Sequence, residues 1–450
     1  MSLSFIQACE GGKRKIAELL LDNEVVEANY TDEKGRTALH YAAHRGYADI
    51  VKKLIDKGAE VDYEDHKGET PLYFAFLQNQ KSTALLLLKN DAKIAIKDYE
   101  GNSLLHLAAK NGQKELCEVL IEKGMEVDGT NNKAETPLMY AVFYRKKIVV
   151  QFLIEAGADV NFLSKSGYAP LHIAIDIKNI PITKLLLEAG ATIDHPTANG
   201  DTPLLKACMD RNRMLVKLLI DNGANVFVTN SEGMSPIYYA CGNNQKEVVE
   251  LFLEQGLDVN YTLPLSGNQS SMNSYLDWVE TANDLSLNSA YTLNSSYTYG
   301  GESLLHLAVK NGHLYMVKLL VEKGAKINIQ DESENTALHY AASNGKKDIV
   351  KFLLENGADT EMSNVKEQKA IDYSNIRGYN EITELILKYM PKDTVIKNLS
   401  NPTANTTEKV SELTEEEIME KLKSLKKLFK NELIDEQEYK VEKAKLIALL

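Results

Sequence analysis

The chain has 450 residues, 44% of them hydrophobic, and carries a formal net charge of −13 with a pI near 5.3. This acidic balance argues against a nucleic acid or an anionic membrane as the main partner, although it does not exclude a local basic patch. No run approaches the ~20 apolar residues of a membrane span, so we expect a soluble protein. A chain of this length forms several domains unless it is a stack of repeats.

The N-terminus reads MSLSFIQACEGGKRK. It lacks the basic stretch and long apolar run of a secretory signal, so we expect none. The segment from Phe5 to Cys9 is loosely similar to a lipoprotein cleavage site. We interpret it instead as the end of a first helix, because Gly12 then matches Gly46 in repeat position.

A periodic series of glycines begins at residue 35. Its members lie on a lattice of 33 residues, with Ala134 in the place of one glycine. The surrounding text repeats as well: GRTALHYAAHRG starts at residue 35, GNSLLHLAAKNG at 101 and GDTPLLKACMDR at 200, and related text resumes at 301 and 334. Self-similarity at this period predicts a repeat protein. The lattice glycines are Gly35, Gly68, Gly101, Gly167, Gly200 and Gly233.

Each repeat predicts two short helices and a turn. Thr or Ser stands where the first helix needs an N-cap, and in four repeats a proline follows, where a missing N–H costs nothing. Apolar residues at helical spacing, such as Val51 and Leu54, then predict a second helix that ends at Gly58. Turn formers between repeats suit a protruding finger. The expected N-caps are Thr37, Thr70, Ser103, Thr136, Thr202, Ser235, Ser303 and Thr336.

This text resembles the ankyrin repeat, whose signature centres on T-P-L-H-x-A-A. The resemblance covers roughly residues 2–390, about eleven units, and implies an all-α fold, a solenoid of stacked helix-turn-helix units with finger turns. One unit cannot bury its apolar face alone, so stability must come from stacking. The resemblance also implies that five histidines at one motif place bridge neighbouring units by hydrogen bonds. They are His40, His106, His172, His306 and His339.

We predict no catalytic, cofactor-binding or metal-binding residues. Motif histidines of adjacent units should sit too far apart to share a zinc with bonds of about 2 Å. Cys208 and Cys241, at equivalent places in adjacent units, are expected roughly 8–10 Å apart, beyond disulfide reach. With Cys9 and Cys117, they are expected as free thiols in a reducing cytosol. The chain has no phosphate-binding glycine loop, H-E-x-x-H, nucleophile elbow or Cys-x-x-Cys pair, so we expect no enzyme.

The lattice also indicates where a partner would bind. In ankyrin proteins the residues closing the first helix, and finger positions beside the lattice glycine, generally line the concave face. In the middle repeats these places hold apolar and aromatic side chains, as interface hot spots do. We predict a protein or peptide groove; the alternative is that Phe143, Ile177 and Met209 turn inward and pack between units. The predicted contact residues are Leu77, Tyr99, Phe143, Tyr144, Tyr168, Ile177, Met209 and Met234.

The middle repeats lack the glycine that ends the first helix elsewhere. A non-glycine residue in left-handed geometry costs on the order of 1 kcal/mol, and Ala169 also replaces a capping Thr. We therefore predict a looser or differently curved centre; drift without selection is an equally simple explanation. The replacing residues are Asn79, Arg145, Lys178, Arg211 and Asn244.

The lattice breaks once, where Gly233 and Gly301 lie 68 residues apart. Residues 262–300 are dense in Ser, Asn, Tyr and Gly and hold the only tryptophan, a composition typical of binding loops. We predict an inserted loop in which Tyr275 and Trp278 contact a partner or dock on the solenoid. The alternative is a degenerate repeat that has lost its motif.

The C-terminal part divides in two. Residues 391–411 are poor in large apolar groups, which predicts a flexible linker. Residues 412–450 carry two capping motifs and an apolar stripe, which predict a small two-helix module. This segment resembles the short C-terminal domain of bacterial and phage proteins, which implies oligomerisation or docking and a bacterial or phage source; a solvated hairpin is the alternative. The predicted association residues are Leu422, Leu425, Leu428, Ile434, Tyr439 and Leu446.

The sequence therefore predicts a cytoplasmic bacterial scaffold or adaptor. It would capture a protein partner on its concave face and inserted loop and form a homo-oligomer through its C-terminal module, without binding nucleic acid, membrane or cofactor. One alternative is a translocated effector that binds host proteins. Another is an inhibitor, immunity or phage counter-defence protein that blocks an enzyme and whose acidic charge mimics nucleic acid.

Overall fold

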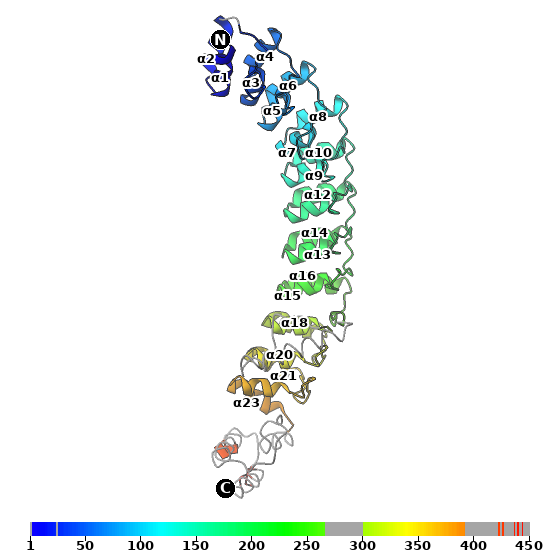
Figure 1. The fold of residues 1–450 in the computed structure, drawn as a ribbon. Helices are drawn as coiled ribbons and strands as arrows, with labels where there is room; N and C mark the ends of the chain where they lie inside the picture. Colours follow the sequence, from blue (N-terminus) through cyan, green and yellow to red (C-terminus); the bar gives the residue numbers. More distant parts are fainter. Residues whose placement is uncertain are drawn as a thin grey trace. The chain divides into compact units, whose positions relative to one another are not determined.

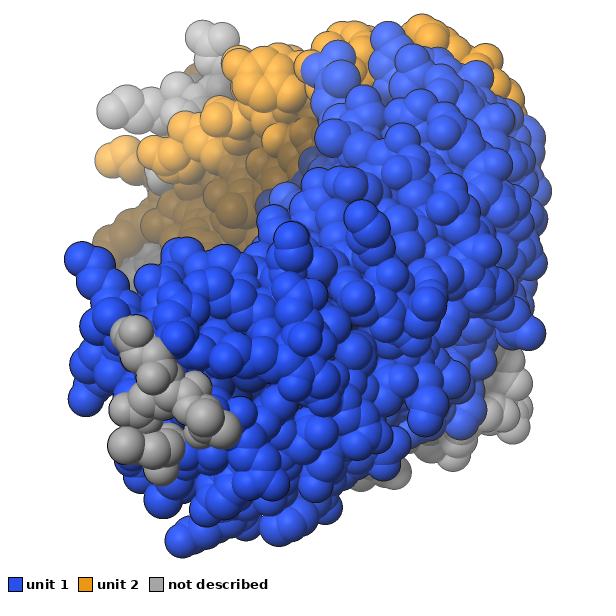
Figure 2. Space-filling view, turned by 90° about the horizontal axis from the view of Figure 1, so that it is seen from above, with its two compact units in different colours: residues 1–232 blue, residues 233–450 orange. Residues whose placement is uncertain are grey.

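The computed structural model describes residues 2–23, 26–265 and 300–391, and single positions between 422 and 443. The chain forms two compact units, residues 1–232 and residues 233–450 (Figure 2). Of the predicted linker, only Pro391 lies within the described residues.

Unit 1 is built from helix pairs that follow one another along the chain (Figure 1). Within a pair the first helix packs on the second, and each also packs on its counterpart in the next pair, so the unit has two helix layers. The first helices are α1 (Ser2–Glu10), α3 (Ala38–Arg45), α5 (Pro71–Leu77), α7 (Leu104–Asn111), α9 (Pro137–Phe143), α11 (Pro170–Asp176) and α13 (Pro203–Met209). The second helices are α2 (Arg14–Asn23), α4 (Ala48–Asp56), α6 (Lys81–Lys89), α8 (Lys114–Glu122), α10 (Lys147–Glu155), α12 (Ile180–Glu188) and α14 (Arg213–Asp221).

Unit 2 repeats this arrangement. Its first helices are α15 (Pro236–Gly242), α18 (Leu304–Lys310), α20 (Ala337–Ser343) and α22 (Ala370–Ile376), and its second helices are α16 (Lys246–Glu254), α19 (Leu314–Glu322), α21 (Lys347–Glu355) and α23 (Asn380–Tyr389). Among the described residues, extended pairing is confined to isolated bridges. The predicted all-α solenoid is confirmed. No helix in the described part of the chain is long and apolar enough to cross a membrane.

The first helices begin where the capping residues predict. The Thr70 hydroxyl accepts a hydrogen bond from the Tyr73 N–H at 3.3 Å, and Thr136 and Thr202 cap α9 and α13 in the same way. A proline follows each of these three caps at the first helical position. The capping Thr and Ser residues are therefore confirmed as helix starts. Ala169 and Lys369, the N-caps of α11 and α22, have no side-chain oxygen to offer.

A ladder of leucines fills the core of unit 1. One leucine stands at the same place in each second helix from α4 onward, and every one is fully buried. Removing such a side chain from water stabilises the fold by roughly 1.5–3 kcal/mol, and most of its contacts are with neighbouring pairs because one pair cannot enclose it. The ladder consists of Leu54, Leu87, Leu120, Leu153, Leu186 and Leu219.

Four of the five motif histidines join neighbouring repeats. The expected bridge is wrong for the fifth, His306, whose buried Nε2 atom has no hydrogen-bond partner among the described residues. The Nδ1 atom of His40 accepts a bond from the Thr37 backbone N–H at 3.1 Å, so its Nε2 atom carries the proton and donates to the Glu69 carbonyl at 3.0 Å. Burial lowers the pKa of His40 to about 4. The same pair of bonds recurs at His106, His172 and His339, which reach the carbonyls of Glu135, His195 and Gln368.

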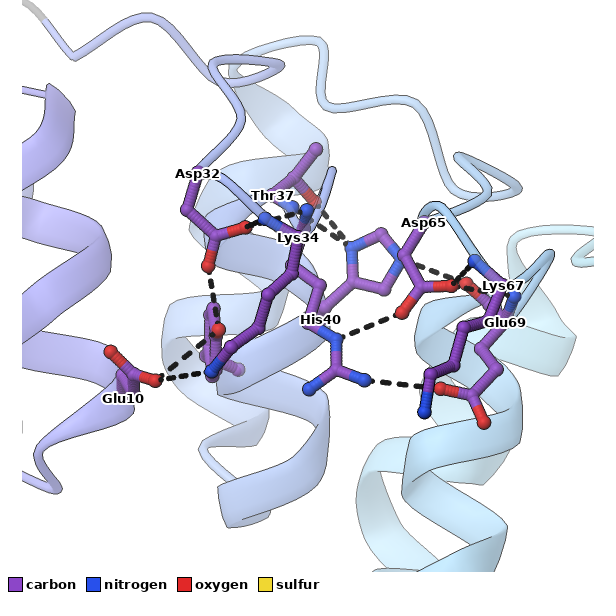
Figure 3. A network of polar contacts seen from close by, with 10 residues as sticks. Glu10, Asp32, Lys34, Thr37, His40, Asp65, Lys67 and Glu69 are labelled. Atoms are coloured by element: carbon purple, nitrogen blue, oxygen red, sulfur yellow. Dashed lines mark hydrogen bonds and ion pairs between the residues drawn. The ribbon is translucent and has the colours of Figure 1, made fainter.

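The fingers carry a second set of bonds between repeats (Figure 3). One carboxylate oxygen of Asp32 accepts the backbone N–H groups of Lys34 and Arg36, at 2.8 and 2.9 Å, which shapes the finger turn. The Arg36 guanidinium then reaches the next finger, 2.8 Å from Asp65 and 3.1 Å from Glu69. Amide pairs take this place at Asn102–Asn131 and Asn335–Asn364, at 2.9 and 2.8 Å. The fingers are thus fixed to one another as well as to their helices.

The residues that replace the helix-ending glycines adopt left-handed backbone geometry. Asn79, Arg145, Lys178, Arg211 and Asn244 have φ between 56° and 60°. This confirms the predicted conformation, and each of these side chains therefore costs the fold on the order of 1 kcal/mol relative to glycine. The looser centre that we infer from them stays a prediction.

The finger after α16 contains the inserted segment. Thr262 forms an isolated bridge with Ser303, the counterpart of the Thr31–Thr37 bridge in the first finger. Next to it, the Gly301 N–H donates to the Leu263 carbonyl at 3.0 Å. In the first finger this bridge joins residues that are six positions apart. Here the equivalent bridge joins the residues on either side of the insertion.

The helices on either side of this segment are in contact. These two first helices pack directly on each other, as α16 does on α19. The Asn311 side-chain amide donates to the Gly242 carbonyl at 3.2 Å, and the Cys241 thiol lies 3.4 Å from the Leu304 carbonyl. These contacts favour an inserted loop over a degenerate repeat, and both interpretations of residues 262–300 stay predictions. Tyr275 and Trp278 lie outside the described residues.

The described positions of the C-terminal segment are helical. Leu425 is buried, and Leu422 and Tyr439 are half-buried. Leu428, Ile434 and Leu446 lie outside the described residues. The predicted two-helix module and its self-association stay predictions.

Candidate protein-binding surface

The ends of the first helices form a row in unit 1. The row is tied together by bonds from one repeat to the next, in which the Asn111 amide donates to the Phe76 carbonyl at 3.0 Å and the Arg145 guanidinium donates to the Ile177 carbonyl at 2.9 Å. Most of the predicted contact residues lie on this row or on the adjacent fingers. We call these residues the inner strip; they are Leu77, Tyr99, Phe143, Tyr144, Tyr168, Ile177 and Met209.

The exposed fractions separate the two sequence interpretations. Phe143 is 57% exposed and Met209 is 37% exposed, so the alternative in which they turn inward is wrong for both. Ile177 follows that alternative, because it is half-buried and packs against the core of the repeats. Tyr99, on its finger, is 90% exposed, and Tyr168 is half-buried with its ring 5.6 Å from the His172 ring.

An ordered aromatic group stands at the end of α9. The Tyr144 ring meets the Phe143 ring edge-on at 5.1 Å and the Tyr140 ring at 6.2 Å, and Tyr140 packs at 5.2 Å against His106 of the previous repeat. Edge-on pairs of this kind add about 0.5–1.5 kcal/mol beyond the area that they bury. The exposed rings are therefore held in place before any partner arrives, which lowers the entropy cost of binding.

Two cations flank this aromatic pair. The Lys110 ammonium lies 5.2 Å from the centre of the Tyr144 ring, a cation–π distance. On the other side, the Arg145 guanidinium extends to the end of α11, where it donates to the Ile177 carbonyl. Among the described residues, neither cation has a carboxylate within 4.0 Å.

Carboxylates follow further along the row. Lys206 lies between Asp176 and Asp210, 3.8 Å from each. Burial, followed by the Asp210 charge, raises the pKa of Asp176, although Lys206 opposes the shift. One ammonium is therefore shared by two carboxylates here.

Several contacts of this surface, and two exposed residues outside it, escape the sequence prediction. The repeat pattern places Lys110 at the end of a first helix, but the contacts of Lys110 with Tyr144 and of Arg145 with Ile177 join different repeats, and no local pattern indicates them. Ile148 and Met214 are apolar and 69% and 61% exposed on the opposite layer, in α10 and α14. The sequence contained a signal for both, since each is the second residue of its second helix, where most other repeats carry a charged or polar side chain.

One predicted contact residue belongs to the other unit. Met234 lies in unit 2, where it is half-buried at the end of the finger before α15. Among the described residues, no cluster of His, Cys, Asp or Glu has the arrangement of a metal site. All four cysteines are buried without a disulfide, and burial raises the pKa of Cys9 and Cys117 to about 12.

Comparison with protein families decides the class of the molecule. The family model described as ankyrin repeats in three copies matches residues 5–98, 96–164, 171–262, 279–364 and 305–398. The chain belongs to the ankyrin-repeat family. Ankyrin repeats are protein–protein interaction modules and are generally non-catalytic.

Among solved structures, the human ASB11 ankyrin repeat domain is similar to this ankyrin-repeat chain. The identity is 26% and the TM-score 0.44, over 49% of this chain and 98% of that domain. No curated protein matches the chain.

Proposed function

We propose that this ankyrin-repeat protein is an adaptor that captures a protein partner on the inner strip of unit 1. The observation that carries the proposal is the exposed, ordered pair Phe143 and Tyr144 at the centre of the strip. Large exposed aromatic side chains in fixed positions are the residues that most often dominate interface energies. Family membership supports the proposal, because ankyrin repeats bind proteins.

The proposal includes the arrangement of the whole chain. We infer that each helix pair is one repeat unit, that the insertion over 262–300 adds contacts to the same partner, and that the C-terminal module mediates self-association or docking. A resident bacterial adaptor in the cytoplasm, a translocated effector and an enzyme inhibitor would all use such a surface. The identity of the captured protein distinguishes the three.

Affinity capture from the native cell tests the inner strip. The test variant is Phe143→Ser/Tyr144→Ser/Tyr168→Ser in the full chain, and the matched control is Ile148→Ser/Met214→Ser, which removes exposed apolar side chains from the opposite layer. The wild type and the control should retain one abundant partner, and the triple variant should lose it while keeping its thermal midpoint near that of the control. Equal capture by all three proteins would reject the proposal.

A further inference from the structure

We infer that the partner segment bound by the inner strip is acidic, with an aromatic or large aliphatic side chain placed between carboxylates. The inference rests on the proposed function and adds to it the chemistry of the partner. Its basis is the juxtaposition of an exposed aromatic pair with cations on both sides, on a chain whose net charge is −13.

Phe143 and Tyr144 determine which partner side chain packs at the centre of the strip; we call this side chain the anchor. Both rings are exposed, and they meet edge-on, so between them they present ring faces and edges over which one large side chain can pack. A small or polar side chain at this point would leave the rings in water. The partner therefore places an aromatic or large aliphatic residue here.

Lys110 and Arg145 determine where the partner's carboxylates lie. Lys110 approaches the rings from the α7 side, and Arg145 extends toward α11, so the two charges lie on opposite sides of the anchor. The Arg145 guanidinium has five N–H donors, and one bond to the Ile177 carbonyl leaves others to receive a carboxylate. A carboxylate on each side of the anchor satisfies both cations at once.

The Lys206 ammonium, at the end of the strip, is already shared by Asp176 and Asp210, at 3.8 Å each. It therefore offers less attraction to a further carboxylate than Lys110 and Arg145 do. We expect the partner's carboxylates at Lys110 and Arg145, between the ends of α7 and α11.

A random 16-residue peptide library displayed on phage, selected on the full-length protein, tests this inference. We expect the selected sequences to carry Phe, Trp, Tyr or Leu with Asp or Glu within a few positions on both sides. Selection on Lys110→Glu/Arg145→Glu should remove this excess of Asp and Glu. The control Lys184→Glu/Lys217→Glu makes the same charge change on α12 and α14 and should leave the excess intact.

The best selected peptide gives a quantitative readout by fluorescence anisotropy. Its affinity should fall roughly ten- to thirtyfold for Lys110→Glu/Arg145→Glu and less for Lys110→Gln/Arg145→Gln. Both variants lose two partly exposed charge pairs, and the Glu variant also repels the carboxylates of the peptide. Raising the salt concentration should weaken the wild type and leave the Gln variant nearly unchanged.

The outcomes separate this inference from the proposed function. Peptides that lose binding on Phe143→Ser/Tyr144→Ser but show no excess of Asp or Glu would keep the proposed function and overturn the acidic partner. Peptides insensitive to both the aromatic and the charge variants would overturn both. A selected pool rich in Lys and Arg would also contradict the inference.

Discussion

At the scale of single residues, the hydrogen bonds of the bridging histidines depend on the protonation state of the ring. In His40 and His339, Nδ1 accepts a backbone N–H, and Nε2 donates to a carbonyl of the next repeat. A second proton on Nδ1 would face a donor and would sit in a buried site. Burial accordingly lowers the pKa of both to about 4.

This protonation behaviour predicts that acid weakens the solenoid. The unfolded chain binds a proton at each such histidine below about pH 6.5, whereas the fold binds it only below about 4. The free energy of unfolding should therefore fall as the pH drops through this window, by about 1.4 kcal/mol per pH unit for each histidine. Urea unfolding of the wild type and of His40→Gln measures the effect; the variant should show the shallower dependence, and identical slopes would contradict the account.

A left-handed residue supplies a second prediction at this scale. Lys178 has φ of 56° and an exposed side chain, so Lys178→Gly should raise the free energy of unfolding by about 0.5–1 kcal/mol, because relief of strain outweighs the added freedom of the unfolded chain. Lys184→Gly, in the interior of α12, should lower it by about 1 kcal/mol. Chemical unfolding of the two variants compares the same substitution in two backbone conformations. A loss of stability in both variants would show that the left-handed backbone at Lys178 is not strained.

At the scale of the element, α11 lacks one component of its N-cap. Ala169 has the extended backbone geometry of the other N-caps, with φ −90° and ψ 163°, and is buried as they are. Ala169→Thr should therefore stabilise the protein by about 1 kcal/mol, because the new hydroxyl can accept a hydrogen bond from a backbone N–H in the first turn of the helix. Ala169→Val has the same shape without the oxygen and should give no such gain in the thermal midpoint. Equal gains would assign the effect to packing instead of capping.

The finger insertion predicts a clean deletion. Removing residues 266–300 joins Leu265 to Gly301, restores the 33-residue step, and places Thr262 and Ser303 six positions apart, as in the Thr31–Thr37 bridge. The shortened chain should fold with an unchanged circular dichroism spectrum and a free energy of unfolding that is equal or slightly higher, because a shorter loop costs less entropy to close. Loss of the cooperative transition would show that the insertion supports the fold. Normal partner capture by this variant would mean that the insertion adds no contacts.

At the scale of the whole molecule, the sequence predicts the interactions within one repeat and misses most of those between repeats. The caps at Thr70 and Thr136, the turn at Gly58 and the leucine ladder depend on residues within one repeat, so a 33-residue pattern indicates them. The orientation of Phe143 and Ile177, and the approach of Lys110 to Tyr144, depend on how two repeats pack, and no local pattern contains that information. The finger bridge across the insertion pairs residues that are far apart in sequence and was missed for the same reason.

The two faces of unit 1 differ in how their exposed apolar side chains are packed. Both layers of unit 1 carry exposed apolar side chains in the middle repeats, Phe143 and Met209 on the inner strip and Ile148 and Met214 on the second helices. On the inner strip, the exposed Phe143 and Tyr144 rings pack edge-on against each other and lie between two cations, Lys110 and Arg145. Binding is therefore expected there, and the outer side chains serve as an internal comparison.

Site-specific photo-crosslinking in the native cell tests this central claim most directly. A benzophenone side chain placed at Tyr144 probes the inner strip, and the same group at Ile148, a few residues along the chain but in the other layer, probes the outer face. We predict one discrete protein adduct from position 144 and none from position 148. Adducts of equal yield at both positions, or an adduct at position 148 alone, would contradict binding on the inner strip.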